Sequence, residues 1–188
     1  PVIPVLTITD PACARPLAEA LVAGGLKTME VTLRTDAAFE AISEMGKVKD
    51  AVVGAGTVLN EYHLDASLAA GARFIVSPGL TEVLAKEALD RKIAFLPGVA
   101  TASDIMRGID LGFEHFKFFP AGPLGGIPAL KALSAPFPNC RFCPTGGITQ
   151  ESASAWLALN TVLCVGGSWL VPSGKIDFET VQQQALDA

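Results

Sequence analysis

The sequence predicts an α/β fold with a single domain, a (β/α)8 barrel. Half of its 188 residues are hydrophobic, which is enough to bury a sizeable core. Short runs of β-branched and aromatic residues alternate eight times with longer Ala- and Leu-rich segments that fit helices. This alternation implies parallel strands, because each crossover between parallel strands needs a connection such as a helix. No linker or change in composition interrupts it, so residues 1–188 form one predicted domain.

Each predicted element follows from its local pattern. In chain order, strands are expected at residues 2–7, 28–33, 51–54, 73–76, 94–96, 115–118, 141–143 and 162–165. Helices are expected at residues 11–23, 36–45, 61–70, 81–90, 102–110, 126–134, 150–159 and 178–187. Glycines at 24–25, 71 and 112 are typical of helix C-termini, and threonines at 81, 101 and 149 are typical N-caps. An open doubly wound sheet is the alternative, but the first strand lacks the G-x-G-x-x-G turn of dinucleotide-binding sheets.

Composition excludes several classes of partner. The formal net charge is −5 and there is no basic run, which argues against nucleic acid or an anionic membrane surface. No apolar stretch approaches the ~20 residues that span a bilayer, and no secretory signal is visible, so we expect a cytoplasmic protein. The chain begins with Pro1 rather than Met, which leaves room for an upstream segment.

The four cysteines, at 13, 140, 143 and 164, include one C-x-x-C pair. A zinc site needs a second such pair or nearby histidines, and the chain has two His. We therefore expect small core residues in a reducing compartment, and no metal site.

Lys117 lies in an aromatic run, residues 115–120, that contains the sixth predicted strand. Alternation puts Phe116 and Phe118 on one face, and His115, Lys117 and Phe119 on the other. A buried ammonium is costly, which leaves two interpretations. The lysine stem extends to water, or the amine is kept neutral and attacks a carbonyl to form a Schiff base. His115 lies deeper in the strand and is expected to be a core or network residue.

The second predicted strand offers partners for this amine. Function in a (β/α)8 barrel lies at the C-terminal strand ends, and we expect Glu30, Thr32 and Arg34 to face into the barrel there. Glu30 and Arg34 can form a structural ion pair. Alternatively, Schiff-base cleavage of a carbon–carbon bond needs an amine, a general base and a cation that holds a carboxylate, and Lys117, Glu30 and Arg34 supply one of each.

Two glycine loops follow the seventh and eighth predicted strands, at residues 145–147 (Thr-Gly-Gly) and 166–168 (Gly-Gly-Ser). Glycine lets the backbone approach a ligand closely, and helix N-termini attract anions. These two loops frequently bind phosphate in barrels. From the residues alone, we predict a phosphorylated keto acid as the ligand.

Six blocks, in order, resemble the 2-keto-3-deoxy-6-phosphogluconate (KDPG) and 4-hydroxy-2-oxoglutarate (KHG) aldolase family: EVTLRT (30–35), VGAGTVL (53–59), SPGLT (77–81), FKFFPA (116–121), RFCPTGGIT (141–149) and LCVGGSWLVP (163–172). The resemblance covers almost the whole chain. It implies a class I aldolase of the Entner–Doudoroff pathway with a TIM-barrel fold, no cofactor and usually a homotrimeric assembly. It also implies cleavage of KDPG to pyruvate and D-glyceraldehyde 3-phosphate.

The resemblance further implies the roles of individual residues. Lys117 would form the Schiff base, and Glu30 would be the general acid/base. The implied substrate-binding residues are Arg34, Thr57, Pro78, Phe119 and Thr145, and the implied phosphate-binding residues are Gly146, Gly147, Gly167 and Ser168.

Two departures from the family pattern lead to further expectations. Members usually have a helix ahead of the first strand, and its apparent absence would leave the bottom of the barrel uncovered. Gly122 stands where members commonly have Glu, which would affect the loop after the sixth strand. Alternative functions are aldolases for 4-hydroxy-2-oxoglutarate or 2-dehydro-3-deoxy-6-phosphogalactonate, and a non-catalytic barrel that serves as a scaffold or binding protein.

Overall fold

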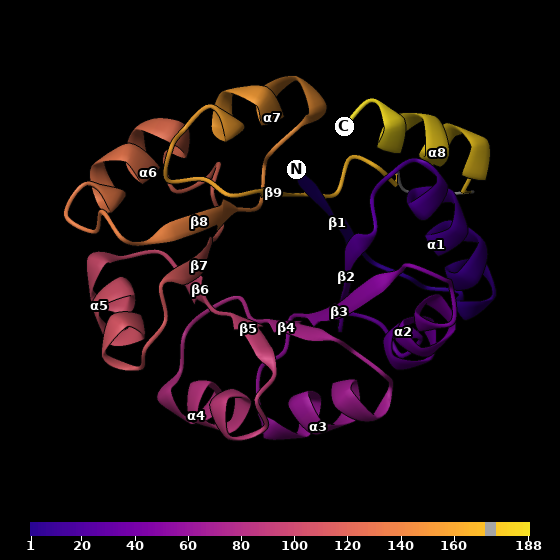
Figure 1. Cartoon of the computed structure of the whole chain (residues 1–188), viewed down its shortest axis with the longest axis horizontal. Coiled ribbons are helices and arrows are strands. Elements are labelled where there is room, and N and C mark those ends of the chain that lie inside the picture. The colour runs from indigo at the N-terminus through magenta and orange to yellow at the C-terminus, as the bar shows by residue number, and fades with distance from the viewer. Residues whose placement is uncertain (172–175) are drawn as a thin grey trace.

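The computed structural model describes residues 1–171 and 176–188 and has the predicted architecture, a ring of parallel strands surrounded by helices (Figure 1). The strands are β1 (Val2–Leu6), β2 (Thr28–Thr32), β3 (Val52–Gly56), β4 (Phe74–Val76), β5 (Ala94–Leu96), β6 (Gly98–Val99), β7 (His115–Phe118), β8 (Arg141–Pro144) and β9 (Val165–Gly167). The helices are α1 (Ala14–Ala23), α2 (Ala38–Gly46), α3 (Glu61–Ala69), α4 (Glu82–Asp90), α5 (Ala102–Asp110), α6 (Gly126–Ser134), α7 (Gln150–Leu157) and α8 (Phe178–Leu186), and a 3-10 turn, η1 (Pro11–Cys13), precedes α1.

The strands pair in the order of the chain. One sheet has the order β5-β4-β3-β2-β1-β9 and the other has the order β6-β7-β8. β5 and β6 are two pieces of the fifth barrel strand, separated by Pro97, which has no N–H to donate. On the opposite side, β8 joins the segment around β9 through the bridges Phe142–Val162 and Thr145–Gly166. The ring is therefore closed, as a (β/α)8 barrel requires.

The predicted elements agree closely with the observed ones. The predicted bounds of β5, β7, α5 and α6 are the observed bounds. The prediction of the eighth strand at residues 162–165 is wrong at both ends. Residues before Val165 contact β8 through an isolated bridge rather than a continuous ladder, and pairing with β1 continues to Gly167. The three threonine N-caps are confirmed, because each side chain accepts a hydrogen bond from a backbone N–H three residues later: Thr81 from Leu84, Thr101 from Asp104 and Thr149 from Ser152.

Hydrophobic layers between the strands and helices hold the ring in place. Phe116 and Phe118 are buried, as their alternation on β7 predicts, and the Phe116 ring lies against Gly108 of α5. Leu17 and Ile42, on α1 and α2, are fully buried in the layer outside β1–β4. Each such side chain contributes roughly 1.5–3 kcal/mol to folding. The strands are therefore anchored from outside, and the residues between these positions face the interior.

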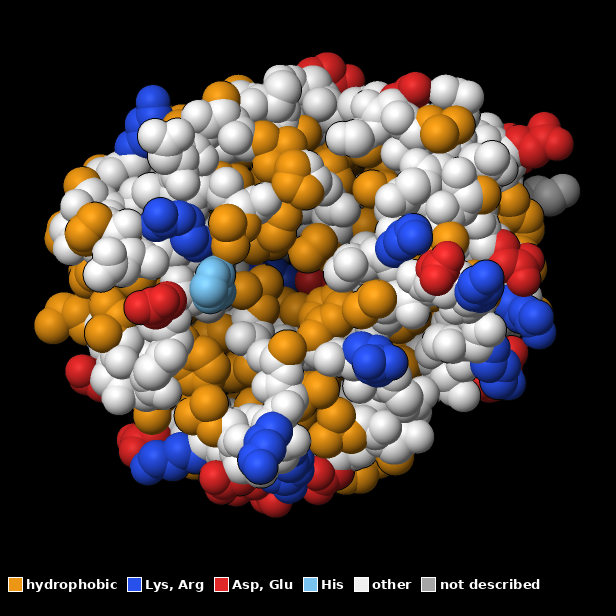
Figure 2. Space-filling model, in the orientation of Figure 1, with side chains coloured by type: hydrophobic (Ala, Val, Ile, Leu, Met, Phe, Trp, Pro, Cys, Tyr) orange, Lys and Arg blue, Asp and Glu red, His pale blue; other side chains and the backbone are white. Residues whose placement is uncertain are grey.

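Figure 2 shows a hollow in the middle of this ring, lined mostly by hydrophobic side chains. In the part of the chain that the structure describes, none of the helices has the length and apolarity needed to cross a membrane.

Candidate active site

Lys117 and Glu30 meet inside the barrel. Lys117 is the third residue of β7 and Glu30 the third residue of β2. Lys117 Nζ lies 3.1 Å from Glu30 Oε1 and 3.5 Å from Oε2. Their side chains are 6% and 5% exposed, respectively, and two charges so far from water are costly unless each satisfies the other. The Phe119 ring lies on the same face, with its centroid 5.2 Å from Lys117 Nζ.

The alternative ion pair between Glu30 and Arg34 is not formed among the described residues, where the partner of the Glu30 carboxylate is Lys117. Arg34 follows the end of β2 and is exposed. It lines a pocket of about 390 Å³ together with Asp36 and His63. The guanidinium therefore lies outside the buried interior, where a ligand can reach it.

The prediction for His115 is wrong. His115 is the first residue of β7 and is exposed, rather than part of the core or of a buried network. Alternation along β7 puts His115 on the same face as Lys117. The error arose because the side chain lies at the end of the strand, where the barrel no longer covers it.

Gly56, which is not among the predicted site residues, makes room for the Glu30 carboxylate. It is the last residue of β3 and pairs with Thr32 of β2. A Cβ atom at Gly56 would lie 2.0 Å from Glu30 Oε1, well inside van der Waals contact. Alternation along the strand predicts that Gly54 and Gly56 face the barrel interior, as Glu30 does. That Gly56 makes room for Glu30 depends on the register between β2 and β3, which the sequence of one strand does not contain.

Thr57, a predicted substrate-binding residue, has a backbone φ of 60°. A β-branched residue rarely adopts this left-handed conformation, which costs roughly 1–3 kcal/mol. Such strain is common at functional sites because the surrounding structure holds the residue in place. Here the strained residue directly follows Gly56, beside the Glu30 carboxylate.

Thr145 directly follows β8, the strand that pairs with the strand of Lys117. Cys143 is the register partner of Lys117, and Thr145 follows it by two residues, on the same face. The Thr145 hydroxyl lies 3.9 Å from Cys143 Sγ. A Cβ atom at Gly166 would lie 2.3 Å from Thr145 Oγ1, so this glycine allows the contact between β8 and β9 at the site.

The backbone conformation of the loop after β8 is suited to binding an anion. Gly146 and Gly147 have φ values of 96° and 76°, which glycine adopts without steric penalty. The N–H groups of Gly147 and Ile148 have no hydrogen-bond acceptor among the described residues. Unpaired N–H groups just ahead of a helix N-terminus, here that of α7, attract anions.

The loop after β7 is held against this glycine loop. Gly122 N donates to the Gly146 carbonyl oxygen at 2.8 Å, and Ala121 N donates to the Thr145 carbonyl oxygen at 2.8 Å. These are backbone contacts, so the loop does not depend on a glutamate side chain at position 122.

The remaining predicted residues lie at the same end of the strands. Pro78 follows β4 and is exposed, beside Ser77, whose hydroxyl donates to the Gly79 carbonyl oxygen at 2.5 Å. Gly167 is the last residue of β9 and is buried, and Ser168 follows it and is exposed. The structure therefore gathers the predicted residues at the C-terminal strand ends.

The four cysteines are free thiols. Cys140 and Cys143 are buried, as predicted, whereas Cys13 and Cys164 are half-buried. A hydrogen bond with Cys164, together with burial, raises the pKa of Cys143, and the same hydrogen bond lowers the pKa of Cys164. Cys164 is also the more exposed thiol of the two.

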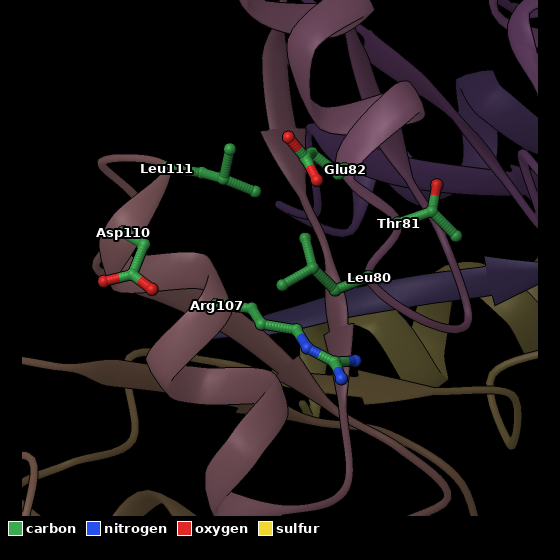
Figure 3. Close-up of a pocket in the computed structure, with 6 residues that line it drawn as sticks. All are labelled: Leu80, Thr81, Glu82, Arg107, Asp110 and Leu111. Carbon is green, nitrogen blue, oxygen red and sulfur yellow. The ribbon is translucent and has the colours of Figure 1, made fainter.

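A groove of about 730 Å³ lies apart from this site, along α5 and the start of α4 (Figure 3). Arg107 extends from α5 toward the segment before α4, where Leu80 lies. The groove is lined by Leu80, Thr81, Glu82, Arg107, Asp110 and Leu111, and it contains no predicted site residue.

Comparisons with known proteins agree with this architecture. The family model described as KDPG and KHG aldolase matches residues 1–185. A 2-dehydro-3-deoxy-phosphogluconate aldolase from Zymomonas mobilis is 57% identical over 188 residues, which cover 100% of this chain and 90% of the relative. The crystal structure of the Zymomonas mobilis ZM4 aldolase with 3-phosphoglycerate has a TM-score of 0.98, again over 100% of this chain and 90% of the other.

Two further solved structures are informative. A KDPG aldolase from Legionella pneumophila, with pyruvate captured as a covalent carbinolamine intermediate, is 45% identical with a TM-score of 0.95 and covers 99% of this chain and 92% of its own. A designed protein cage made by fusing symmetric oligomeric domains is 28% identical with a TM-score of 0.89 and covers 100% of this chain and 70% of its own.

Proposed function

This chain belongs to the KDPG and KHG aldolase family, and from that premise we propose that it cleaves 2-dehydro-3-deoxy-6-phosphogluconate to pyruvate and D-glyceraldehyde 3-phosphate. The observation that carries the proposal is the buried contact of 3.1 Å between the Lys117 amine and the Glu30 carboxylate. A class I aldolase needs one amine and one proton-transferring group that serve the same substrate.

In the proposed cycle, Lys117 Nζ attacks the C2 ketone of the substrate. The attack requires a neutral amine, and the adjacent Glu30 carboxylate can accept the ammonium proton. Glu30 then gives this proton to the carbinolamine hydroxyl, which leaves as water, so that a protonated imine forms and Glu30 is again a carboxylate. The protonated imine acts as an electron sink. Phe119 lines the space beside the nitrogen, and its ring face can stabilise the cationic imine.

Glu30 then removes the proton from the C4 hydroxyl, and the C3–C4 bond breaks. The bonding electrons move into the imine to form an enamine, and glyceraldehyde 3-phosphate leaves. Glu30 returns a proton to C3, and hydrolysis of the imine releases pyruvate and restores the amine. The close packing of the Glu30 side chain against Gly56 supports the use of one carboxylate for both proton transfers.

The remaining residues hold the two ends of the substrate in this proposal. Arg34 binds the carboxylate at C1, because its planar guanidinium can donate two parallel hydrogen bonds. Thr57, Thr145 and Pro78 surround the pyruvate part. The loops containing Gly146, Gly147, Gly167 and Ser168 bind the phosphate, and support comes from the unpaired N–H groups at 147–148 and the 3-phosphoglycerate bound by the Zymomonas mobilis relative.

Borohydride reduction in the presence of pyruvate, followed by peptide mass analysis, tests the proposal. We expect the reduced adduct on Lys117 and not on Lys131, the exposed lysine of α6. Glu30→Gln should lower kcat about 10²- to 10⁴-fold, far more than it weakens pyruvate binding. An adduct elsewhere, or a Glu30→Gln enzyme that turns over normally, would contradict the assignment.

We also propose that the enzyme is a cytoplasmic homotrimer. Support for a reducing compartment comes from the four free thiols, and support for symmetric assembly comes from the designed cage that uses a related domain. Sedimentation equilibrium measures the assembly, and cell fractionation measures the location.

A further inference from the structure

Thr7 lies at the mouth of the barrel, on the inner face that carries Glu30. It directly follows β1, and the register of β1 and β2 pairs Val5 with Glu30 and Leu6 with Val31. The next pair is Thr7 with Thr32, and their hydroxyl oxygens lie 3.0 Å apart. Leu6, between Val5 and Thr7, is buried in the outer hydrophobic layer, so Thr7 points inward.

The height of Thr7 above the reacting groups follows from strand geometry. Two residues along a strand span about 6.6–6.8 Å, so Thr7 lies about 7 Å nearer the C-terminal mouth than the level of Glu30. On its other side, β1 pairs with β9, where Pro4 is the partner of Gly167. Thr7 is therefore placed between Glu30 and the loop proposed to bind phosphate, and it is exposed to a ligand.

The hydrogen bonds around Thr7 decide what it can offer to that ligand. The Thr32 hydroxyl donates its single proton to the Leu6 carbonyl oxygen at 2.8 Å. The Thr7 hydroxyl must therefore be the donor in its contact with Thr32, because Thr32 has no second proton to give. The Thr7 oxygen is left with unshared lone pairs, and it can accept a hydrogen bond from a hydroxyl group.

We propose that Thr7 accepts a hydrogen bond from the C5 hydroxyl of the substrate and so makes the enzyme select α-hydroxy aldehydes. This inference rests on the proposed function, in which Lys117 holds C2, Glu30 serves C4 and the glycine loops hold the phosphate on C6. The C5 carbon then lies between Glu30 and the β9 loop, at the position of Thr7. After cleavage, the same hydroxyl is the one beside the aldehyde in glyceraldehyde 3-phosphate.

The synthetic direction of the reaction tests this selection. Pyruvate is added either to D-glyceraldehyde 3-phosphate or to 3-oxopropyl phosphate, in which hydrogen replaces the hydroxyl. We expect wild type to prefer the hydroxylated aldehyde. Thr7→Val keeps the shape and removes the acceptor, and it should reduce the ratio of the two kcat/KM values about three- to tenfold, the effect of one neutral hydrogen bond.

Two further variants serve as comparisons. Thr7→Ser retains the acceptor and should retain the preference of wild type. Thr28→Val makes the same substitution at the first residue of β2, at the opposite end of the barrel, and should leave the ratio unchanged. An unchanged ratio in Thr7→Val, or an equal change in Thr28→Val, would overturn the role of Thr7.

The outcomes separate this inference from the function on which it rests. If wild type gives no pyruvate adduct at Lys117, the proposed function itself fails. If the adduct forms and Thr7→Val lowers both kcat/KM values equally, the aldolase reaction stands and the selection by Thr7 is refuted.

Discussion

At the scale of single residues, the site depends on two glycines, because their lack of a side chain leaves space for groups of neighbouring strands. Glu30 Oε1 occupies the space where a side chain at position 56 would begin. Thr145 Oγ1 occupies the corresponding space at Gly166. The proposed catalytic carboxylate and a proposed substrate-binding hydroxyl thus both lie against the bare backbone of a neighbouring strand, and a methyl group at either glycine would displace them.

Gly56→Ala should reduce activity without unfolding the protein. The new Cβ atom would lie 2.0 Å from Glu30 Oε1 and 2.6 Å from both Cδ and Cγ, so the whole glutamate side chain must turn away, whereas none of the three atoms belongs to the backbone. A displacement of about 1 Å from the productive position can cost about 10²-fold in rate, so we expect kcat to fall by about that factor. Steady-state kinetics measures the loss, and circular dichroism checks the fold.

Gly46→Ala is the matched control, because a Cβ atom there has no neighbour within 4 Å. It should retain the kcat of wild type. A Gly56→Ala enzyme with normal kcat, or one whose lost activity is matched by lost structure, would show that Gly56 does not position the carboxylate.

At the scale of elements, helix starts are set by local hydrogen bonds, and α5 has the most complete example. Thr101 and Asp104 form a capping box, in which the Asp104 carboxylate accepts from the N–H groups of Ala100 and Thr101 and from the Thr101 hydroxyl. Burial alone would raise the pKa of Asp104, but these hydrogen bonds outweigh it and lower the pKa below its usual value.

Asp104→Asn should therefore destabilise the protein in a pH-dependent way. Because the folded pKa is the lower one, the carboxylate stabilises the fold above the unfolded pKa of about 3.9, and this contribution is lost as the pH falls through the folded pKa. We expect the free energy of unfolding to drop by ~0.3–1 kcal/mol at pH 7, with a smaller difference from wild type at pH 3.5. Urea unfolding at both pH values measures it.

Asp110→Asn, at the last residue of the same helix, is the control. It removes a negative charge from the C-terminus, where the helix dipole disfavours it, and so should not destabilise the protein. A loss of stability in Asp104→Asn that is equal at both pH values would rule out the charge as its cause.

These local signals explain why most of the fold could be predicted. Each strand and helix carries its own alternation, cap or glycine, so the caps at Thr81, Thr101 and Thr149 can be predicted without knowledge of their neighbours in space. The pairing of Lys117 with Glu30 can also be predicted from the sequence, because alternation and barrel order together put both residues inside the ring.

The missed features depend on contacts between distant segments. Gly56 and Thr7 gain their significance from the register of β2 with its two neighbours, which no local pattern contains. The exposure of His115 does not follow from its own sequence, because burial at a strand end depends on what else covers that end. The eighth strand begins later than predicted for a similar reason. Val162 forms only an isolated bridge, because a continuous ladder needs a matching partner on β8.

At the scale of the whole molecule, the barrel is a closed ring, and its first and last helices meet. α1 and α8 pack together outside β1 and β9 (Figure 1). Gly24, which ends α1, touches α8 so closely that a Cβ atom would lie 2.4 Å from Ala185 Cβ and 2.7 Å from the Gln182 carbonyl oxygen. The second of these is a backbone atom, so a side chain at position 24 must push α8 away.

Gly24→Val should thus destabilise the entire domain. Overpacking of this kind typically costs 1–3 kcal/mol, and we expect a loss of about that size in the free energy of unfolding. Far-UV circular dichroism reports on all helices, whereas tryptophan fluorescence reports on Trp156 of α7 and Trp169 after β9. If the ring is one cooperative unit, both signals shift to the same lower urea midpoint, while Gly46→Val, in open space, stays close to wild type. If only the circular dichroism changes, α8 separates from the barrel on its own, and the chain is not the single domain that its sequence predicts.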